Sequence, residues 1–117
     1  MDHEIELETF ESVADGGTRR VSWHVAEGER WLAAVNYPGA RAELCERTPG
    51  VVWRRRVVLS LPTGARLMRV EALPGGVVQR DPLSYLWKAG RAAPQTLQRS
   101  YFSVGPRGSL VRAAREP

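Results

Sequence analysis

The sequence predicts a single, mainly β domain of six to eight short antiparallel strands, arranged as a sandwich or a partly open barrel. Two observations predict this class. Turn-forming Gly and Pro recur at short intervals along the 117 residues, and these residue types favour tight turns. The runs between them are short and β-rich, as is typical of antiparallel sheets. The length fits one domain spanning residues 1–117.

The first half of the chain offers two clear strands. Residues 4–13 alternate glutamate with mostly apolar residues, which indicates a half-buried strand. Residues 18–26 alternate in the same way, and residues 30–37 are the expected hairpin partner. Residues 40–47 are ambiguous between one helical turn and a loop. This half therefore predicts a strand followed by a hairpin.

The second half predicts two more hairpins. Residues 51–61 and 66–73 flank Thr63-Gly64, which we expect to be a two-residue loop. Residues 96–104 and 109–114 flank a Gly-Pro-Arg-Gly turn. In the first of these hairpins the two-residue loop keeps the apolar side chains on one face, and burial usually sets register.

One short helix is expected at residues 82–89, over one face or the open end of the sheet. Asp81 is a suitable N-cap, Pro82 suits the first helical position, and Gly90 suits the end. Lys88 near the last turn matches the helix dipole.

Charge is distributed unevenly along the chain. Residues 1–15 hold six acids and no Arg or Lys, whereas residues 47–117 hold thirteen Arg or Lys and three acids. Such asymmetry favours a basic face for an anionic partner. It is equally compatible with an acidic first strand that neutralises a basic strand beside it.

Three consecutive arginines lie in one predicted strand. Because successive side chains alternate between faces, Arg54 and Arg56 share the polar face and Arg55 shares the core side with Trp53. In the preferred register, Arg56 lies opposite Glu71. We expect the Arg55 stem to lie on the Trp53 ring, near an end of the sheet.

These arginines suggest a non-enzymatic domain that binds nucleic acid, through single strands or the phosphate backbone. Guanidinium groups pair well with phosphate, and aromatic side chains on a sheet stack on bases. The candidate binding residues are Arg54, Arg56, Arg69, Arg66 and Arg99. The competing interpretation is a solvated face of cross-strand ion pairs, since the chain contains no established nucleic-acid recognition motif.

Two other functions stay open. One is a structural or assembly subunit that acts through protein–protein or homo-oligomeric contacts at a sheet edge or an aromatic patch. The other is a carrier of a small apolar ligand, or an enzyme, with a pocket lined by some of the four tryptophans. An enzyme is the least favoured, because no catalytic motif is visible.

No cofactor or metal is expected. The two histidines and lone Cys45 have no further ligands at metal-binding spacing. The acidic N-terminal sequence does not resemble a secretory signal, and no apolar run is long enough to span a membrane. We therefore expect a cytoplasmic protein without a membrane partner.

Overall fold

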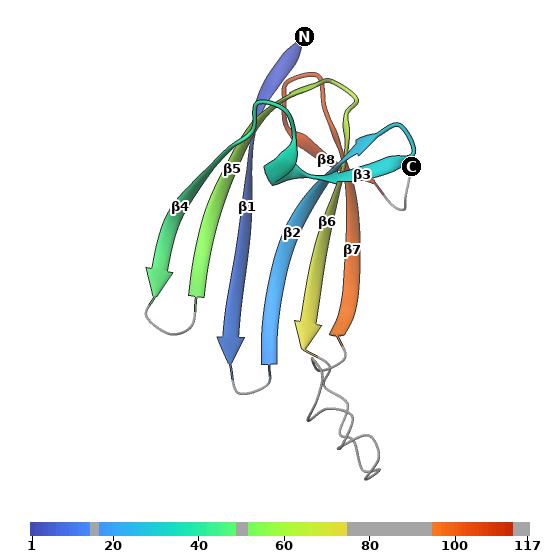
Figure 1. The fold of residues 1–117 in the computed structure, drawn as a ribbon. Coiled ribbons are helices and arrows are strands. Elements are labelled where there is room, and N and C mark those ends of the chain that lie inside the picture. The colour runs from blue at the N-terminus through green and yellow to red at the C-terminus, as the bar shows by residue number, and fades with distance from the viewer. Residues whose placement is uncertain (15–16, 49–51, 75–94, 114–117) are drawn as a thin grey trace.

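The computed structural model describes residues 1–14, 17–48, 52–74 and 95–113. These residues form eight strands in one open antiparallel sheet, with a single turn of 3-10 helix (Figure 1). The mainly β, antiparallel class and the number of strands agree with the sequence prediction. The helix expected at residues 82–89 lies outside the described residues.

The strands differ greatly in length. The three longest, β1, β2 and β5, have 13, 11 and 11 residues. In chain order the elements are β1 (Asp2–Ala14), β2 (Gly17–Glu27), β3 (Arg30–Ala33), η1 (Ala34–Asn36), β4 (Arg41–Thr48), β5 (Val52–Pro62), β6 (Arg66–Pro74), β7 (Gln95–Val104) and β8 (Leu110–Ala113).

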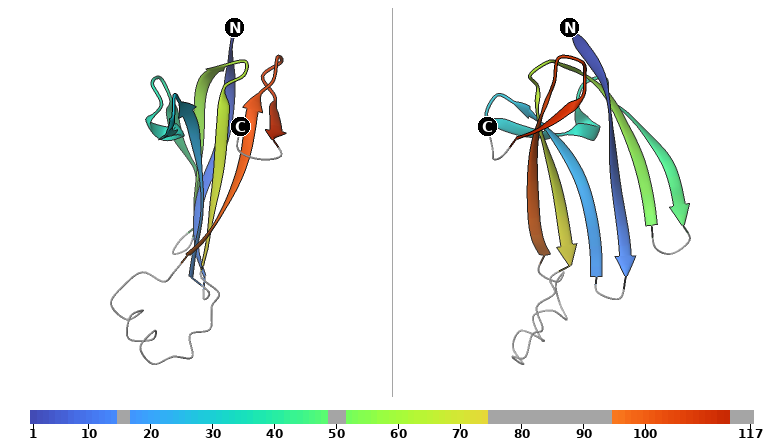
Figure 2. Two further views of the ribbon diagram at one scale, coloured as in Figure 1. Left: turned by 90° about the vertical axis from the view of Figure 1, so that its right-hand side faces the viewer. Right: turned by 180° about the vertical axis from the view of Figure 1, so that it is seen from behind.

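The strand order is β4-β5-β1-β2-β6-β7-β8, and β3 pairs with β2 beside this path. The expected hairpins β2–β3 and β7–β8 are confirmed. The second strand of the first hairpin is shorter than predicted, because the chain leaves the ladder at Ala33 and turns through η1. Seen from the side (Figure 2), β3 with η1 and β8 lie at opposite edges of the group of strands β3, β2, β6, β7 and β8.

The predicted pairing of residues 51–61 with 66–73 is wrong. The turn between them does form, since the Ala65 amide donates to the Pro62 carbonyl at 3.1 Å. However, β5 pairs with β1 and β4, whereas β6 pairs with β2 and β7. The physical reason is burial, because Leu59 and Leu67 pack into one core from two separate groups of strands. The turn therefore joins two parts of the sheet that face each other.

Residues 40–47, which were ambiguous between a helical turn and a loop, are neither. They belong mainly to the edge strand β4, which pairs with β5 and has an irregularity between Leu44 and Glu46. Bulges and charged side chains on an edge strand protect it from pairing with other chains. Arg41 and Glu43 are exposed on this strand.

The core lies at the end of the sheet where β1 begins and β5 ends. Both groups of strands contribute to it, because the sheet folds over on itself there. Burial of this apolar surface is the main stabilising contribution. The buried cluster consists of Ile5, Leu7, Val25, Ala34, Val57, Leu59, Leu61, Leu67 and Val104.

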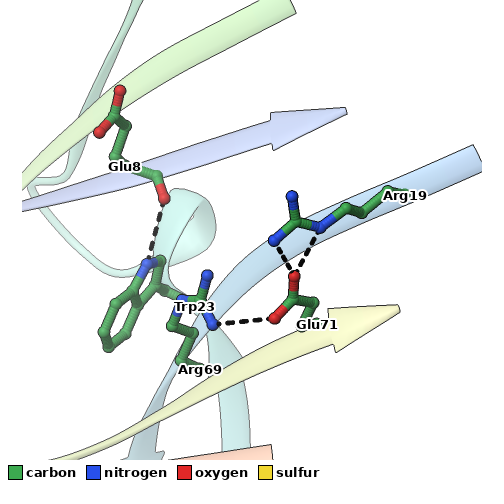
Figure 3. A network of polar contacts seen from close by, with 5 residues as sticks. All are labelled: Glu8, Arg19, Trp23, Arg69 and Glu71. Atoms are coloured by element: carbon green, nitrogen blue, oxygen red, sulfur yellow. Dashed lines mark hydrogen bonds and ion pairs between the residues drawn. The ribbon is translucent and has the colours of Figure 1, made fainter. Parts of the chain in front are cut away.

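Trp23 marks the point at which β1 and β2 separate. The described ladder between these strands runs only from Ala14↔Gly17 to Phe10↔Val21. The Trp23 indole Nε1 donates to the Glu8 carbonyl at 3.2 Å, and its ring lies 5.3 Å from that of Phe102. The Trp23 side chain thus satisfies a backbone acceptor of β1 (Figure 3) and packs against the core.

Candidate nucleic-acid interface

Arg54 and Arg56 lie on a surface rich in carboxylates, which we call the charged face: Asp2, Glu4, Glu6, Glu8, Arg41, Glu43, Arg54 and Arg56, from β1, β4 and β5. Arg54 Nε lies 2.9 Å from Glu8 Oε1, and Arg56 Nε lies 3.9 Å from Glu6 Oε2. Carboxylates outnumber guanidinium groups here, so the charged face carries more negative than positive charge.

This surface confirms one of the two interpretations of the charge asymmetry. The acidic strand β1 does lie alongside the arginine strand β5. The predicted pair of Arg56 with Glu71 is wrong, because Glu8 and Glu43 flank Arg56 instead. Exposed ion pairs of this kind contribute only about 0.2–1 kcal/mol each.

Arg55 lies on the other face of β5, as predicted. Its Cζ atom is 4.7 Å from the centre of the Trp53 ring, which is within the range of a cation–π contact. Arg55 is therefore directed away from Arg54 and Arg56, so the arginine triplet does not form one cluster.

Arg69 belongs to a compact network around Glu71 (Figure 3). Arg19 Nε donates to Glu71 Oε1 at 2.6 Å and its terminal nitrogen forms an ion pair with the same oxygen. Arg69 donates to Glu71 Oε2 at 3.3 Å. The Arg19 guanidinium also lies 5.2 Å from the centre of the Phe10 ring. Glu71 lies opposite Val21 on the same face of the sheet, and Val21 is buried there.

The network lowers the pKa of the Glu71 carboxyl below its ordinary value. The hydrogen bond from Arg19 is the largest cause, and the charges of Arg19 and Arg69 act in the same direction, while burial opposes them. Glu71 is therefore a carboxylate at neutral pH, held between two guanidinium groups. One of these two guanidinium groups is that of Arg69.

The last two predicted residues, Arg66 and Arg99, lie on a different surface. Pairing sets Arg66 opposite Ser103 and Arg99 opposite Val70. Both therefore point away from the core on the sheet formed by β3, β2, β6, β7 and β8. We call this surface the outer face: Arg20, Ser22, His24, Ala26, Trp31, Ala33, Arg66, Met68, Val70, Ala72, Leu97, Arg99, Tyr101, Ser103, Val111 and Ala113.

Two aromatic rings meet on the outer face. The Trp31 and Tyr101 rings are 6.0 Å apart between centroids and tilted by 47°. They come from β3 and β7, with β2 and β6 between them. Both are half-buried, and Met68, which lies opposite Tyr101, is almost fully buried. The rings therefore lean toward each other across the sheet.

The outer face carries little negative charge. No Asp or Glu lies on it within the described stretches of its five strands. Glu11, on neighbouring β1, lies opposite Arg20 and forms an ion pair with it at 2.7 Å. Of the five predicted binding residues, the structure thus brings Arg66 and Arg99 together with aromatic side chains. It places Arg54, Arg56 and Arg69 on other surfaces.

The sequence analysis did not identify Trp31 and Tyr101 as binding residues. Tyr101 and Phe102 were expected on opposite faces, and they are: Phe102 packs against the core and Tyr101 lies on the outer face. No local pattern signals the contact between Trp31 and Tyr101, because it joins residues far apart in the chain.

The two histidines of the described residues each lie close to one hydroxyl side chain. His24 Nε2 lies 3.2 Å from Ser22 Oγ, and burial lowers its pKa. His3 Nε2 lies 2.8 Å from Thr63 Oγ1. Within the described ranges, no three His, Cys, Asp or Glu side chains cluster closely enough to hold a metal ion. Those same ranges contain no helix that could cross a membrane.

Two surface pockets lie at the turn between β2 and β3. The larger, of about 270 Å³, is lined by Glu27, Arg30, Trp31 and Leu32. The smaller, of about 160 Å³, is lined by Ala26, Gly28, Glu29, Arg30, Trp31 and Arg66. The same residue, Trp31, lines both pockets beside charged residues.

Comparison with models of protein families, with curated proteins and with solved structures finds no match to this chain.

Proposed function

We propose that this protein is a non-enzymatic module that binds single-stranded nucleic acid on its outer face. The observation that carries the proposal is the pair of leaning rings, Trp31 and Tyr101, on a sheet face that also bears Arg66 and Arg99. Aromatic side chains stack on bases of any sequence, and arginines pair with the phosphates between them. The paired, carboxylate-rich charged face lacks this combination.

The shape of the surface favours a single strand over a duplex. Arg66 and Arg99 lie on the adjacent strands β6 and β7, with Met68 and Tyr101 between them along the sheet. A single strand that follows this direction can place its bases on the rings and its phosphates on the arginines. Bases stacked within a duplex are not accessible to side chains in this way.

The direct test is fluorescence anisotropy with a labelled oligothymidine of roughly twelve nucleotides, within the span of known sheet-based single-strand sites. We expect Tyr101→Ala to weaken binding by about 1–3 kcal/mol, the usual contribution of one stacked base. Tyr101→Phe retains the ring and is expected to bind nearly as well. If Tyr101→Ala folds, as judged by circular dichroism, and binds like the wild type, the proposal fails.

Salt dependence provides a second readout. Two arginine–phosphate contacts to a single strand predict a slope of log K against log salt of roughly −1.4. The same proposal includes a cytoplasmic location.

Self-association is the second candidate function. Leu97 and Val111 lie on the outer face, and these residues are 46% and 52% exposed. Exposed apolar residues on one face favour contact between copies. Sedimentation velocity over a range of concentrations tests this candidate, and a monomer throughout would exclude it.

A further inference from the structure

The smaller pocket at the β2–β3 turn adjoins the outer face, because Trp31 and Arg66 belong to both. The pocket is lined by two arginines, one tryptophan and one glutamate, together with Ala26 and Gly28. We propose that this pocket takes a guanine base of the bound strand, stacked on Trp31 and read by the carboxylate of Glu29. This inference rests on the proposed function and adds base selectivity to it.

The turn positions the basic part of the pocket. Gly28 has φ +63°, a left-handed conformation that Gly adopts at little cost. Its carbonyl accepts a hydrogen bond of 3.3 Å from a terminal nitrogen of Arg66. The Arg66 guanidinium is thus held against this turn, and Arg66, Arg30 and Trp31 line the same pocket. A phosphate attached to a nucleoside on Trp31 would lie within reach of these two cations.

Glu29 supplies the selectivity. An ionised carboxylate only accepts hydrogen bonds, and its two oxygens match two neighbouring N–H donors. Among the common bases, guanine alone presents two adjacent donors on its Watson–Crick edge, the ring N1–H and the exocyclic amino group. Thymine, adenine and cytosine each place an acceptor beside the single donor group of that edge. In a single strand this edge is open to side chains.

The experiment compares an oligothymidine with the same oligonucleotide carrying one central guanosine, adenosine or cytidine. We expect the guanosine to tighten wild-type binding about tenfold, within the range of a bidentate base contact, and the other two bases to change it less than about threefold. Glu29→Gln removes the matched acceptor pair, so its guanosine preference is expected to fall below about threefold. Its affinity for oligothymidine is expected to be equal to the wild type or higher, because a negative charge is lost.

Glu27→Gln is the matched control. Glu27 lies in the same turn region but lines the neighbouring pocket, so this variant changes the charge equally and is expected to retain the guanosine preference. Loss of the preference in both variants would overturn the assignment of Glu29. Binding of oligothymidine without any guanosine preference would overturn the base-selective pocket and leave the proposed function standing. Absence of binding to every oligonucleotide would overturn both.

Discussion

Glu8 lies directly opposite Arg56 in the register of β1 and β5, yet its carboxylate pairs with Arg54, two residues away along β5, at 2.9 Å. Arg56 makes the equivalent diagonal pair with Glu6, at 3.9 Å. Both diagonal ion pairs are displaced in the same direction along the two strands. Each arginine of the charged face thus has an acidic partner on β1, which separates this surface from the proposed binding site.

The Glu8–Arg54 pair is expected to contribute little stability. A double-mutant cycle with Glu8→Gln and Arg54→Gln should give a coupling free energy of about 0.2–1 kcal/mol at low salt, because both side chains are about half exposed. The coupling should decrease at high salt, where exposed charges are screened. Urea denaturation at the two salt concentrations measures both values. A coupling that high salt leaves unchanged would contradict this account.

Gly108 is expected to be intolerant of a side chain. Its φ is +83°, and a Cβ there would lie 3.0 Å from the His3 Cβ. Gly39 is a matched control, since its φ is +82° but a Cβ there would meet nothing within 4 Å. Gly39→Ala should cost about 1–2 kcal/mol for the left-handed backbone alone, and Gly108→Ala should cost more.

The excess cost of Gly108→Ala should come from contact with His3. His3→Ala keeps the His3 Cβ but removes Cγ and Nδ1, which would each lie 3.2 Å from the added Cβ. Adding it to Gly108→Ala is therefore expected to recover part of the loss, as measured by thermal unfolding. Equal destabilisation at Gly39 and Gly108 would show that the packing of His3 against this turn has no energetic consequence.

Glu71 is expected to link stability to acidic pH. The pKa of its carboxyl is lowered in the folded protein. Its contribution to the free energy of unfolding is therefore fully present above the ordinary Glu pKa of about 4.3 and is lost as the pH falls below that value. Glu71→Gln should remove this part of the pH dependence and destabilise the protein at pH 7. Truncation to alanine should cost about 1–3 kcal/mol, because it leaves Arg19 and Arg69 without their shared acceptor.

The comparison of wild type and Glu71→Gln isolates this effect from the other acids. Denaturation curves between roughly pH 3 and 7 span the ordinary Glu value. The difference in unfolding free energy between the two proteins should shrink as the pH falls. A difference that stays constant over this range would mean that the Glu71 network does not stabilise the ionised form.

His24 is expected to titrate below the ordinary histidine value of about 6.5. Burial disfavours the charged form of the ring and lowers its pKa. The contribution of His24 to the free energy of unfolding is therefore expected to decrease as the pH falls below the ordinary histidine pKa. An NMR titration of the His24 ring measures the midpoint directly. A midpoint at or above the ordinary value would contradict the burial of this ring on the outer face.

The sequence predicted the elements of this fold better than their pairing. Alternation of side chains identified β1, β2 and β5, and it correctly separated Arg55 from Arg54 and Arg56. The prediction that β5 pairs with β6 failed because it rested on the turn at Thr63 and Gly64, which is a local signal. The choice of partner strand depended instead on burial of Leu59 and Leu67 in a shared core.

The candidate site was predictable only in part. Arg66 and Arg99 were among the expected binding residues, but nothing in the local sequence distinguished them from Arg54 and Arg56. Their difference arises from the strands beside them, since β1 brings carboxylates to the charged face and β7 brings Tyr101 to the outer face. Such neighbours are set by long-range pairing.

The most direct test of the proposed function compares two double variants that each remove two positive charges. Arg66→Ala with Arg99→Ala alters the outer face, and Arg54→Ala with Arg56→Ala alters the charged face. The measurement is the affinity for oligothymidine at one fixed salt concentration. We predict that the first pair weakens binding at least about tenfold, as expected for the loss of two charge-assisted contacts, and that the second leaves it within about twofold. Equal weakening by both pairs, or greater weakening by the second, would contradict the outer face as the binding site.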